Sequence, residues 1–188
     1  MARCDVVFFL SRSGQFLDQS DMHLLANQLP QSGVKRMILV AGQYDALLLD
    51  DGFNRDSLAA TEDNLTQRIH KRASTEMGKL AEQRRQAGRD ENADLIAQLT
   101  TPILASTFAH GFAHWPQEQW NEAMQHVYQE LTEMAEDEWD GYQFSHADWL
   151  RIACFDQLTQ AYQVARQDKQ QLLQQQKEGI SIGNTMKN

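Results

Sequence analysis

The sequence predicts an α/β fold in which a partial parallel sheet is followed by a long helical segment. Two apolar runs, residues 6–10 and residues 37–41, lack polar alternation, which is typical of parallel strands buried on both faces. The second run leads directly into residues 42–45, Gly-Gln-Tyr-Asp. Because open α/β sheets bind ligands at the carboxyl ends of their strands, we expect any chemistry to lie near Asp45.

One helix is predicted between the two apolar runs. Asp18 can cap its first turn, and the following apolar residues repeat at helical spacing until Pro30 and Gly33 end the pattern. A connection of this length allows the right-handed crossover that joins two parallel strands. Residues 6–41 are therefore expected to form a strand–helix–strand unit.

A long helix is predicted after the second strand. It is expected to begin near Ser57, with an apolar side and with lysine and arginine residues around the rest. These basic residues are expected to be solvated, and Glu76 and Glu82 stand at the spacing that pairs with them. Gly88 is expected to interrupt the helix, and a short helix should follow at residues 91–99.

A third strand and a further helix are predicted before residue 140. Residues 102–107 are expected to form the strand, which ends in Ser106 and Thr107. Proline suits the first turn of a helix, so Pro116 is expected to open the next one. Its apolar stripe comprises Trp120, Met124, Val127, Leu131 and Met134. These elements complete a predicted partial domain over residues 1–140.

The composition changes beyond this domain. Residues 145–178 are rich in glutamine and repeat apolar residues near helical spacing, which predicts a helical or coiled-coil extension able to self-associate. Residues 179–188 are polar and contain glycine, so they are expected to be a disordered tail.

Bulk composition limits the function further. The chain has 188 residues and a formal net charge of −9, which disfavours binding to nucleic-acid backbones. Its apolar runs are too short for a transmembrane segment. Cys4 and Cys154 are far apart in the sequence, so we expect free thiols and a cytoplasmic protein.

The order of these elements resembles the second half of a P-loop GTPase domain, most of all in bacterial dynamin-like GTPases, where long helices follow it. The resemblance covers about residues 5–140. It implies that the Asp of the fourth family signature, usually Asn/Thr-Lys-x-Asp, accepts hydrogen bonds from the guanine base. Asp45 matches that Asp, whereas Gln43 replaces the lysine and Gly42 replaces the Asn or Thr.

The same resemblance assigns a fifth signature to Ser106 and Thr107, where a short loop after a strand contacts the base oxygen through a backbone N–H. The implied ligand is GTP or GDP, bound by Gln43, Asp45, Ser106 and Thr107. Without the larger pattern, an Asp after a buried strand is more often a turn residue or a helix cap.

The phosphate-binding part of that family is missing from the sequence. No Gly-x-x-x-x-Gly-Lys-Ser/Thr loop occurs, and Mg²⁺ binding is not supported by this chain alone. Because phosphoryl transfer depends on these parts, we expect the chain to be inactive by itself. Either an upstream polypeptide completes the sheet and the nucleotide site, or the chain is the remnant of an interrupted gene.

Two alternative functions, each from a different class of protein, remain open. One is a small helical adaptor or oligomerisation protein that works through residues 145–178. The other is a metal-binding protein, because His110 and His114 would stand one helical turn apart and could ligate zinc. No third ligand follows at suitable spacing, so a loop packed on the sheet is the favoured interpretation of residues 110–114.

Overall fold

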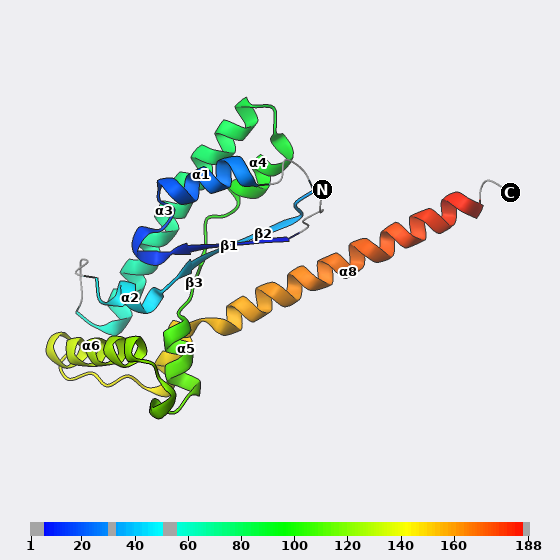
Figure 1. Ribbon diagram of the computed structural model, residues 1–188. Coiled ribbons are helices and arrows are strands. Elements are labelled where there is room, and N and C mark those ends of the chain that lie inside the picture. The colour runs from blue at the N-terminus through cyan, green and yellow to red at the C-terminus, as the bar shows by residue number, and fades with distance from the viewer. Residues whose placement is uncertain (1–5, 30–32, 51–55, 186–188) are drawn as a thin grey trace. The chain divides into compact units, whose positions relative to one another are not determined.

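The computed structural model describes residues 6–29, 33–50 and 56–185. The chain divides into two compact units, Met1–Phe155 and Asp156–Asn188. The first unit is mostly helical and is built on one small sheet of three parallel strands (Figure 1). This confirms the predicted α/β class in its coarse form.

The three strands are neighbours in the order β1, β2, β3. They comprise β1 (Val6–Arg12), β2 (Arg36–Gly42) and β3 (Ile103–Leu104). All pairs are parallel, with Val6 opposite Arg36 and Val40 opposite Ile103. The two apolar runs are therefore strands, as predicted. The third strand is shorter than expected, because the chain turns into a helix directly after it.

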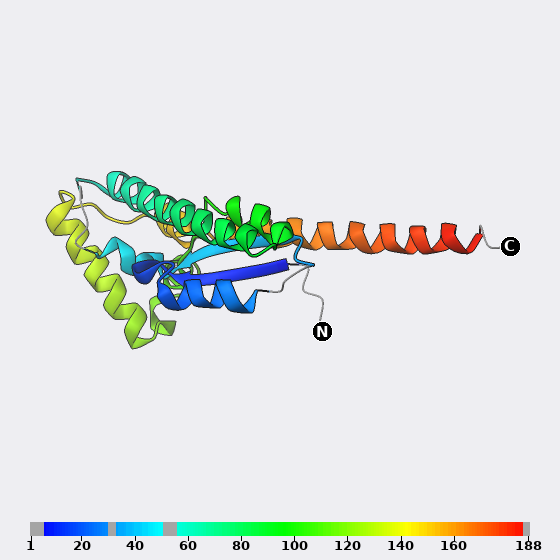
Figure 2. The ribbon, with the colours of Figure 1, turned by 90° about the horizontal axis from the view of Figure 1, so that it is seen from above.

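Three helices cover one face of the sheet (Figures 1 and 2). They are α1 (Gln19–Gln28), α3 (Leu58–Gln86) and α4 (Asp90–Ala97). The predicted cap is confirmed, since the Asp18 side chain accepts from the Asp21 N–H. The long helix begins near Ser57 as predicted, and the Ser57 side chain accepts from the Ala60 N–H. Gly88 adopts φ +70° between α3 and α4, a conformation that favours glycine. Pro30 lies outside the described residues.

The sheet buries one face in the core, whereas its other face is unevenly covered, with Val40 of β2 buried and part of β1 exposed. Met37, Leu39, Ala41 and Leu104 belong to the buried cluster, and Val7 and Phe9 pack against it. On the opposite face of β1, Phe8 is 43% exposed and Leu10 is 69% exposed. The prediction that the first run is covered on both faces is therefore wrong, because the helices of the first unit lie against the other face.

Pairing along α3 agrees with the predicted charge pattern, with one exception. Glu76 accepts from Lys79 at 3.2 Å and pairs with Arg72 at 3.3 Å. Arg84, expected to be solvated, is 3% exposed and donates to the Leu25 carbonyl at 2.7 Å. Two carbonyls near the end of α1, those of Leu25 and Ala26, thus accept hydrogen bonds from a buried guanidinium of α3.

Helices α5 (Thr107–His114), α6 (Glu122–Glu138) and α7 (His146–Ala153) form the rest of the first unit. Aromatic rings fill the space among them, with Phe112 5.0 Å from Trp149 and Phe144 stacked 4.3 Å from Trp149 between ring centroids. Gly111 permits this packing, because an added Cβ would lie 2.4 Å from Met124 Cε.

The boundaries of these helices correct two predictions. Residues 107–114 are helical rather than a loop, because the Ser106 hydroxyl accepts from the Ala109 N–H and caps the first turn. Helix α6 begins at Glu122, capped by Asn121, and not at Pro116. Pro116 instead precedes a 3-10 turn at Gln117–Gln119.

The predicted helix from residue 145 is in fact two helices. Cys154 adopts φ +55° and separates α7 from α8 (Phe155–Thr185). The second unit consists of α8 beyond Phe155. This helix continues to Thr185, so the expected irregular tail does not begin at residue 179, and residues 186–188 lie outside the described part of the chain.

Candidate functional site

The carboxyl ends of the three strands gather polar residues at one edge of the sheet. Ser11 and Ser13 stand at the end of β1, Asp45 follows β2, and Ser106 follows β3. All four side chains belong to buried residues. In a parallel sheet these strand ends meet where α/β folds bind ligands, so this edge is the candidate site.

Asp45 and Ser106 are brought together at this edge although 61 positions separate them. The Ser106 hydroxyl donates to the Asp45 carboxylate and accepts from the Ala109 N–H at 2.9 Å. Asp45 is 4% exposed and Ser106 is fully buried. The Ser106 hydroxyl therefore links Asp45, in the segment that follows β2, to the first turn of α5.

Asp45 also belongs to the first turn of α2 (Tyr44–Leu48), where the helix dipole favours a negative charge. Burial raises the pKa of Asp45 above its usual range, while hydrogen bonds from Ser106 and from the N–H groups of Asp45 and Ala46 act in the opposite direction. The carboxylate is thus held in a fixed position but at an electrostatic cost.

Backbone contacts hold the two predicted signature segments against each other. The Ala105 N–H donates to the Ala41 carbonyl at 2.8 Å, and the Tyr44 N–H donates to the Ala105 carbonyl at 3.1 Å. These two bonds extend the β2–β3 pairing past the last residue of β3. The orientation of Asp45 toward Ser106 is therefore set by the backbone of both segments.

Gln43 and Thr107, the other two predicted site residues, are exposed. Gln43 adopts φ +59°, which is uncommon for a residue with a side chain. Its carbonyl accepts a hydrogen bond of 2.8 Å from the Ser13 hydroxyl. Thr107 is the first residue of α5. The structure therefore unites Asp45 and Ser106 and leaves Gln43 and Thr107 at the surface beside them.

Two serines of this edge were not predicted from the sequence. Ser13 fixes the turn at Gln43, and the Ser11 hydroxyl donates to the Asp21 carboxylate and accepts from the Leu17 N–H at 3.0 Å. The signal that could have found them is the pattern Ser-Arg-Ser directly after the first apolar run. Small hydroxyl side chains suit this position because they satisfy backbone groups where a strand ends.

The hydrogen-bond acceptor that the sequence analysis assigns to a guanine base is the Asp45 carboxylate. A carboxylate can accept the two N–H donors of a guanine edge, and Asp45 supplies one. The described hydrogen bonds commit one of its oxygens to Ser106. Among the described residues, no group of three or more His, Cys, Asp or Glu side chains could hold a metal ion. In this structure the Asp45 carboxylate is buried and bonded to Ser106.

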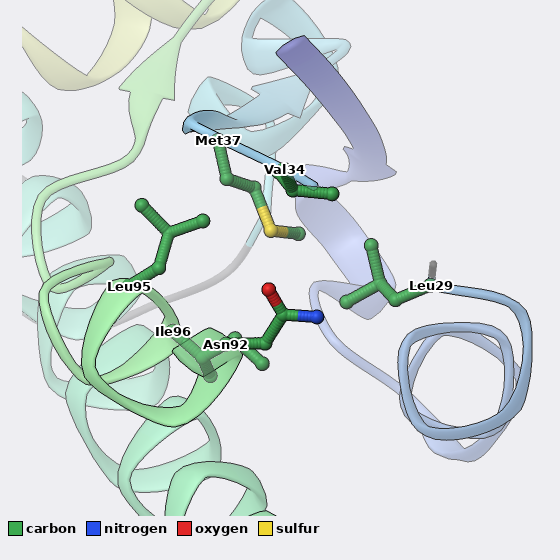
Figure 3. Close-up of a pocket in the computed structure, with 6 residues that line it drawn as sticks. All are labelled: Leu29, Val34, Met37, Asn92, Leu95 and Ile96. Carbon is green, nitrogen blue, oxygen red and sulfur yellow. The ribbon is translucent and has the colours of Figure 1, made fainter. Parts of the chain in front are cut away.

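Two hollows lie near the sheet. One, of about 270 Å³, opens beside the carboxyl end of β1 and is lined by Leu10, Arg12, Gln15, Asp18, Ser20 and Asp21. The other, shown in Figure 3, lies where the end of α1, the start of β2 and α4 meet, and it is lined by Leu29, Val34, Met37, Asn92, Leu95 and Ile96. Its side chains leave no space for a water molecule, so it is a packing junction.

The histidines of α5 belong to no group of three metal-ligating side chains among the described residues. His110 and His114 lie one turn apart with ring centroids at 4.4 Å, and His110 stacks on Phe155 at 4.1 Å. His146 is near them, with its ring centroid 6.4 Å from that of His114. Burial, followed by the charge of His114, lowers the pKa of His110. The rings therefore pack against one another, and burial favours the neutral form of His110.

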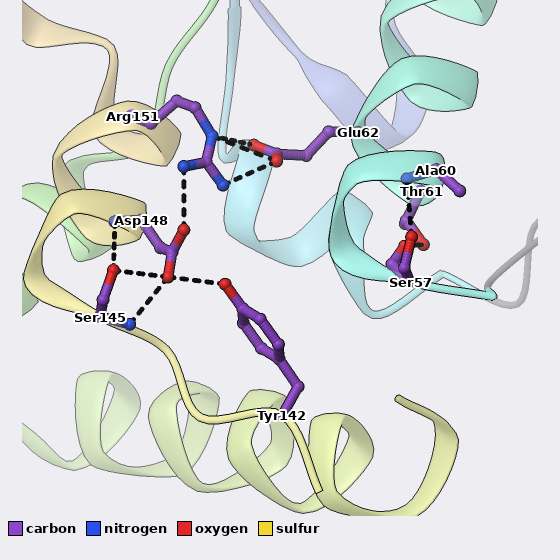
Figure 4. Close-up of polar contacts among 8 residues, drawn as sticks. All are labelled: Ser57, Ala60, Thr61, Glu62, Tyr142, Ser145, Asp148 and Arg151. Atoms are coloured by element: carbon purple, nitrogen blue, oxygen red, sulfur yellow. Dashed lines mark hydrogen bonds and ion pairs between the residues drawn. The ribbon is translucent and has the colours of Figure 1, made fainter. Parts of the chain in front are cut away.

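A polar network joins α7 to α3 (Figure 4). Arg151 donates to Asp148 at 2.8 Å and to Glu62 of α3 at 2.9 Å. Asp148 accepts from the Tyr142 hydroxyl at 2.8 Å and from the Ser145 hydroxyl at 2.7 Å. We call these five residues the Asp148 network. The pattern Ser-x-x-Asp at residues 145–148 was its sequence signal, as a capping box.

Comparison with protein-family models, with curated proteins and with solved structures found no match to this chain. In the described part of the chain, no helix has both the length and the apolar character needed to cross a bilayer.

Proposed function

We propose that this chain is the carboxyl-terminal half of a GTPase-like domain, similar to that of dynamin-like GTPases. In this proposal it recognises the guanine base of GTP or GDP only within a complete domain and is inactive alone. The supporting observation is the meeting of Asp45 and Ser106 at the ends of two neighbouring parallel strands. A base-recognising carboxylate held by a serine from the next loop is consistent with the two signatures that the sequence resembles.

The burial of Asp45 explains why the isolated chain is expected not to bind. At 4% exposure, its carboxylate can receive a base only if the segment around Gln43 opens. In a complete domain, contacts with the phosphates would offset the cost of that opening. This chain has no phosphate loop to provide them.

The position of β1 at the end of the strand order supports the need for a second polypeptide. β1 is seven residues long, and among the described residues β2 is the strand with which it pairs. Open edges of this length are usually paired or covered in native proteins. An upstream polypeptide that adds a parallel strand here would bring its own loop to the same edge as Asp45.

Calorimetric titration with GTP or GDP and Mg²⁺ tests the proposal. The chain alone should give no micromolar binding. Coexpressed with the polypeptide encoded upstream, it should bind guanine nucleotide, and Asp45→Ala should abolish that binding. Asp137→Asn is the matched control, because Asp137 is an exposed carboxylate on α6. Micromolar binding by the chain alone, or binding by the complex that survives Asp45→Ala, would contradict the proposal.

A helical adaptor is the second candidate. The observation that favours it is that α8 runs for 31 residues and most of it forms a compact unit separate from residues 1–155. If α8 mediates self-association, light scattering should give a higher mass for the whole chain than for a version ending at residue 155. Equal monomeric masses would exclude this role for α8.

A further inference from the structure

The hollow at the carboxyl end of β1 is the strongest unassigned site of the first unit. It has a volume of about 270 Å³ and is lined by Leu10 and Arg12 of β1, by Gln15 of the 3-10 turn Ser13–Gln15, and by Asp18, Ser20 and Asp21 at the start of α1. Pockets for drug-sized ligands begin at about 300 Å³, so this hollow suits a smaller molecule. It lies at the edge of the sheet where α/β folds bind ligands.

This hollow carries charges of both signs that are not paired with each other. In the part of the chain that the structure describes, the Arg12 guanidinium has no hydrogen bond or ion pair, and none joins it to Asp18 or Asp21. Asp18 Oδ1 accepts from the Asp21 N–H at 2.9 Å, and Asp21 Oδ2 accepts from the Ser11 hydroxyl. The second oxygen of each carboxylate accepts no hydrogen bond from the described residues. One guanidinium and two carboxylate oxygens are therefore available to a ligand.

Hydrogen bonds tie together the segments that surround the hollow. The Leu17 N–H donates to the Ser11 hydroxyl at 3.0 Å, and the Asp18 N–H donates to the Gln15 carbonyl at 3.1 Å. Arg72 of α3 donates to the Leu17 carbonyl at 3.0 Å. Leu17 is fully buried at φ +54°, which is uncommon for a residue with a side chain. Because these contacts fix the turn, a ligand would have to order little of the chain on binding.

From these observations we infer that the hollow binds a small zwitterion, the free form of an apolar α-amino acid. The carboxylate of the ligand would accept hydrogen bonds from Arg12, and its ammonium group would donate to the available oxygens of Asp18 and Asp21. Its apolar side chain would lie on Leu10, the apolar residue of the lining, which is 69% exposed. A purely anionic ligand would be repelled by the two carboxylates, and a purely cationic ligand would leave Arg12 without a partner. This inference depends on the hollow alone and does not require nucleotide binding at Asp45.

The test is an NMR titration of the whole chain with L-leucine. The amide signals of residues 10–21 should shift as L-leucine is added and give a Kd of about 1 mM or below. Two matched probes each lack one charge, since isopentylamine has no carboxylate and isocaproate has no ammonium group. Each should bind at least about tenfold more weakly than L-leucine, because one side of the hollow then has no charged partner.

Three variants locate the ligand. Arg12→Gln should weaken L-leucine binding about tenfold, because a charge-assisted hydrogen bond is lost. Asp18→Asn should weaken it by a similar factor without changing the start of α1, because asparagine caps a helix as well as aspartate does. Lys71→Gln is the matched control, because it removes a positive charge from an exposed position of α3 and should leave binding unaltered.

Several results would overturn the inference. If isopentylamine or isocaproate bound as tightly as L-leucine, the hollow would select a single charge and not a zwitterion. Binding of L-leucine that survives both Arg12→Gln and Asp18→Asn, or shifts confined to signals outside residues 10–21, would place the ligand elsewhere. No shift of any signal at about 10 mM L-leucine would remove the site.

Discussion

Acid is expected to weaken the Asp148 network and with it the attachment of α7 to α3. Burial alone would raise the pKa of Asp148, but hydrogen bonds from Ser145, Tyr142 and Arg151 outweigh it and lower the pKa from 3.8 to about 2. Asp148 is 6% exposed, so solvent screening of these contacts is small. The gap between 3.8 and about 2 corresponds to about 2 kcal/mol of folding free energy.

The sign of this change in stability with pH follows from the direction of the pKa change on folding. A carboxyl group whose pKa is lowered on folding stabilises the protein fully above its unfolded pKa, near 3.8 for Asp148. That stability is lost as the pH falls through the folded pKa of about 2. Asp148→Asn cannot ionise, so it should lower the free energy of unfolding at pH 7 by about 2 kcal/mol and remove this part of the acid dependence.

Urea unfolding followed by circular dichroism at pH 7, 4 and 2.5 measures the effect. The difference between the wild type and Asp148→Asn should be about 2 kcal/mol at pH 7 and should shrink toward pH 2.5. Asp137→Asn, at an exposed position of α6, should show little difference at any of these pH values. A difference for Asp148→Asn that stays constant with pH would refute the electrostatic reasoning.

Two further predictions concern Asp45 and the glycines of α5 and α3. Because burial raises the pKa of Asp45, its favourable contribution to folding is present below the unfolded pKa and is lost as the pH rises through the folded pKa. Asp45→Asn keeps an acceptor for Ser106 and should raise the free energy of unfolding at pH 7. A large decrease in the free energy of unfolding measured with urea would contradict this. Gly111→Ala should lower the melting temperature, because its Cβ would meet the Trp115 ring at 3.0 Å as well as the more flexible Met124 Cε at 2.4 Å. Gly78→Ala, inside α3 with no atom within 4 Å of the added Cβ, should instead stabilise by about 1 kcal/mol, and equal effects of the two changes would refute the packing argument.

Local signals predicted most elements of the first unit. The apolar runs at β1 and β2 and the caps Asp18 and Ser57 act within a few residues, so their effect can be read from the sequence. Predictions failed where two local signals competed. Pro116 and Asn121 can both open a helix, and the structure uses Asn121 because its side chain caps the Met124 N–H.

The candidate site, too, could be predicted only in part from local sequence signals. The position of Asp45 after a buried strand, and its interest as a ligand-binding carboxylate, follow from residues 37–45 by themselves. Its burial against Ser106 does not, because that contact exists only once β2 and β3 are neighbours. The sequence by itself therefore determined the parallel strands, the main helix starts and the residues worth examining. Only the tertiary structure decided that Ser106 occupies the Asp45 carboxylate and that Phe8 and Leu10 are exposed, since burial depends on which distant segments pack together.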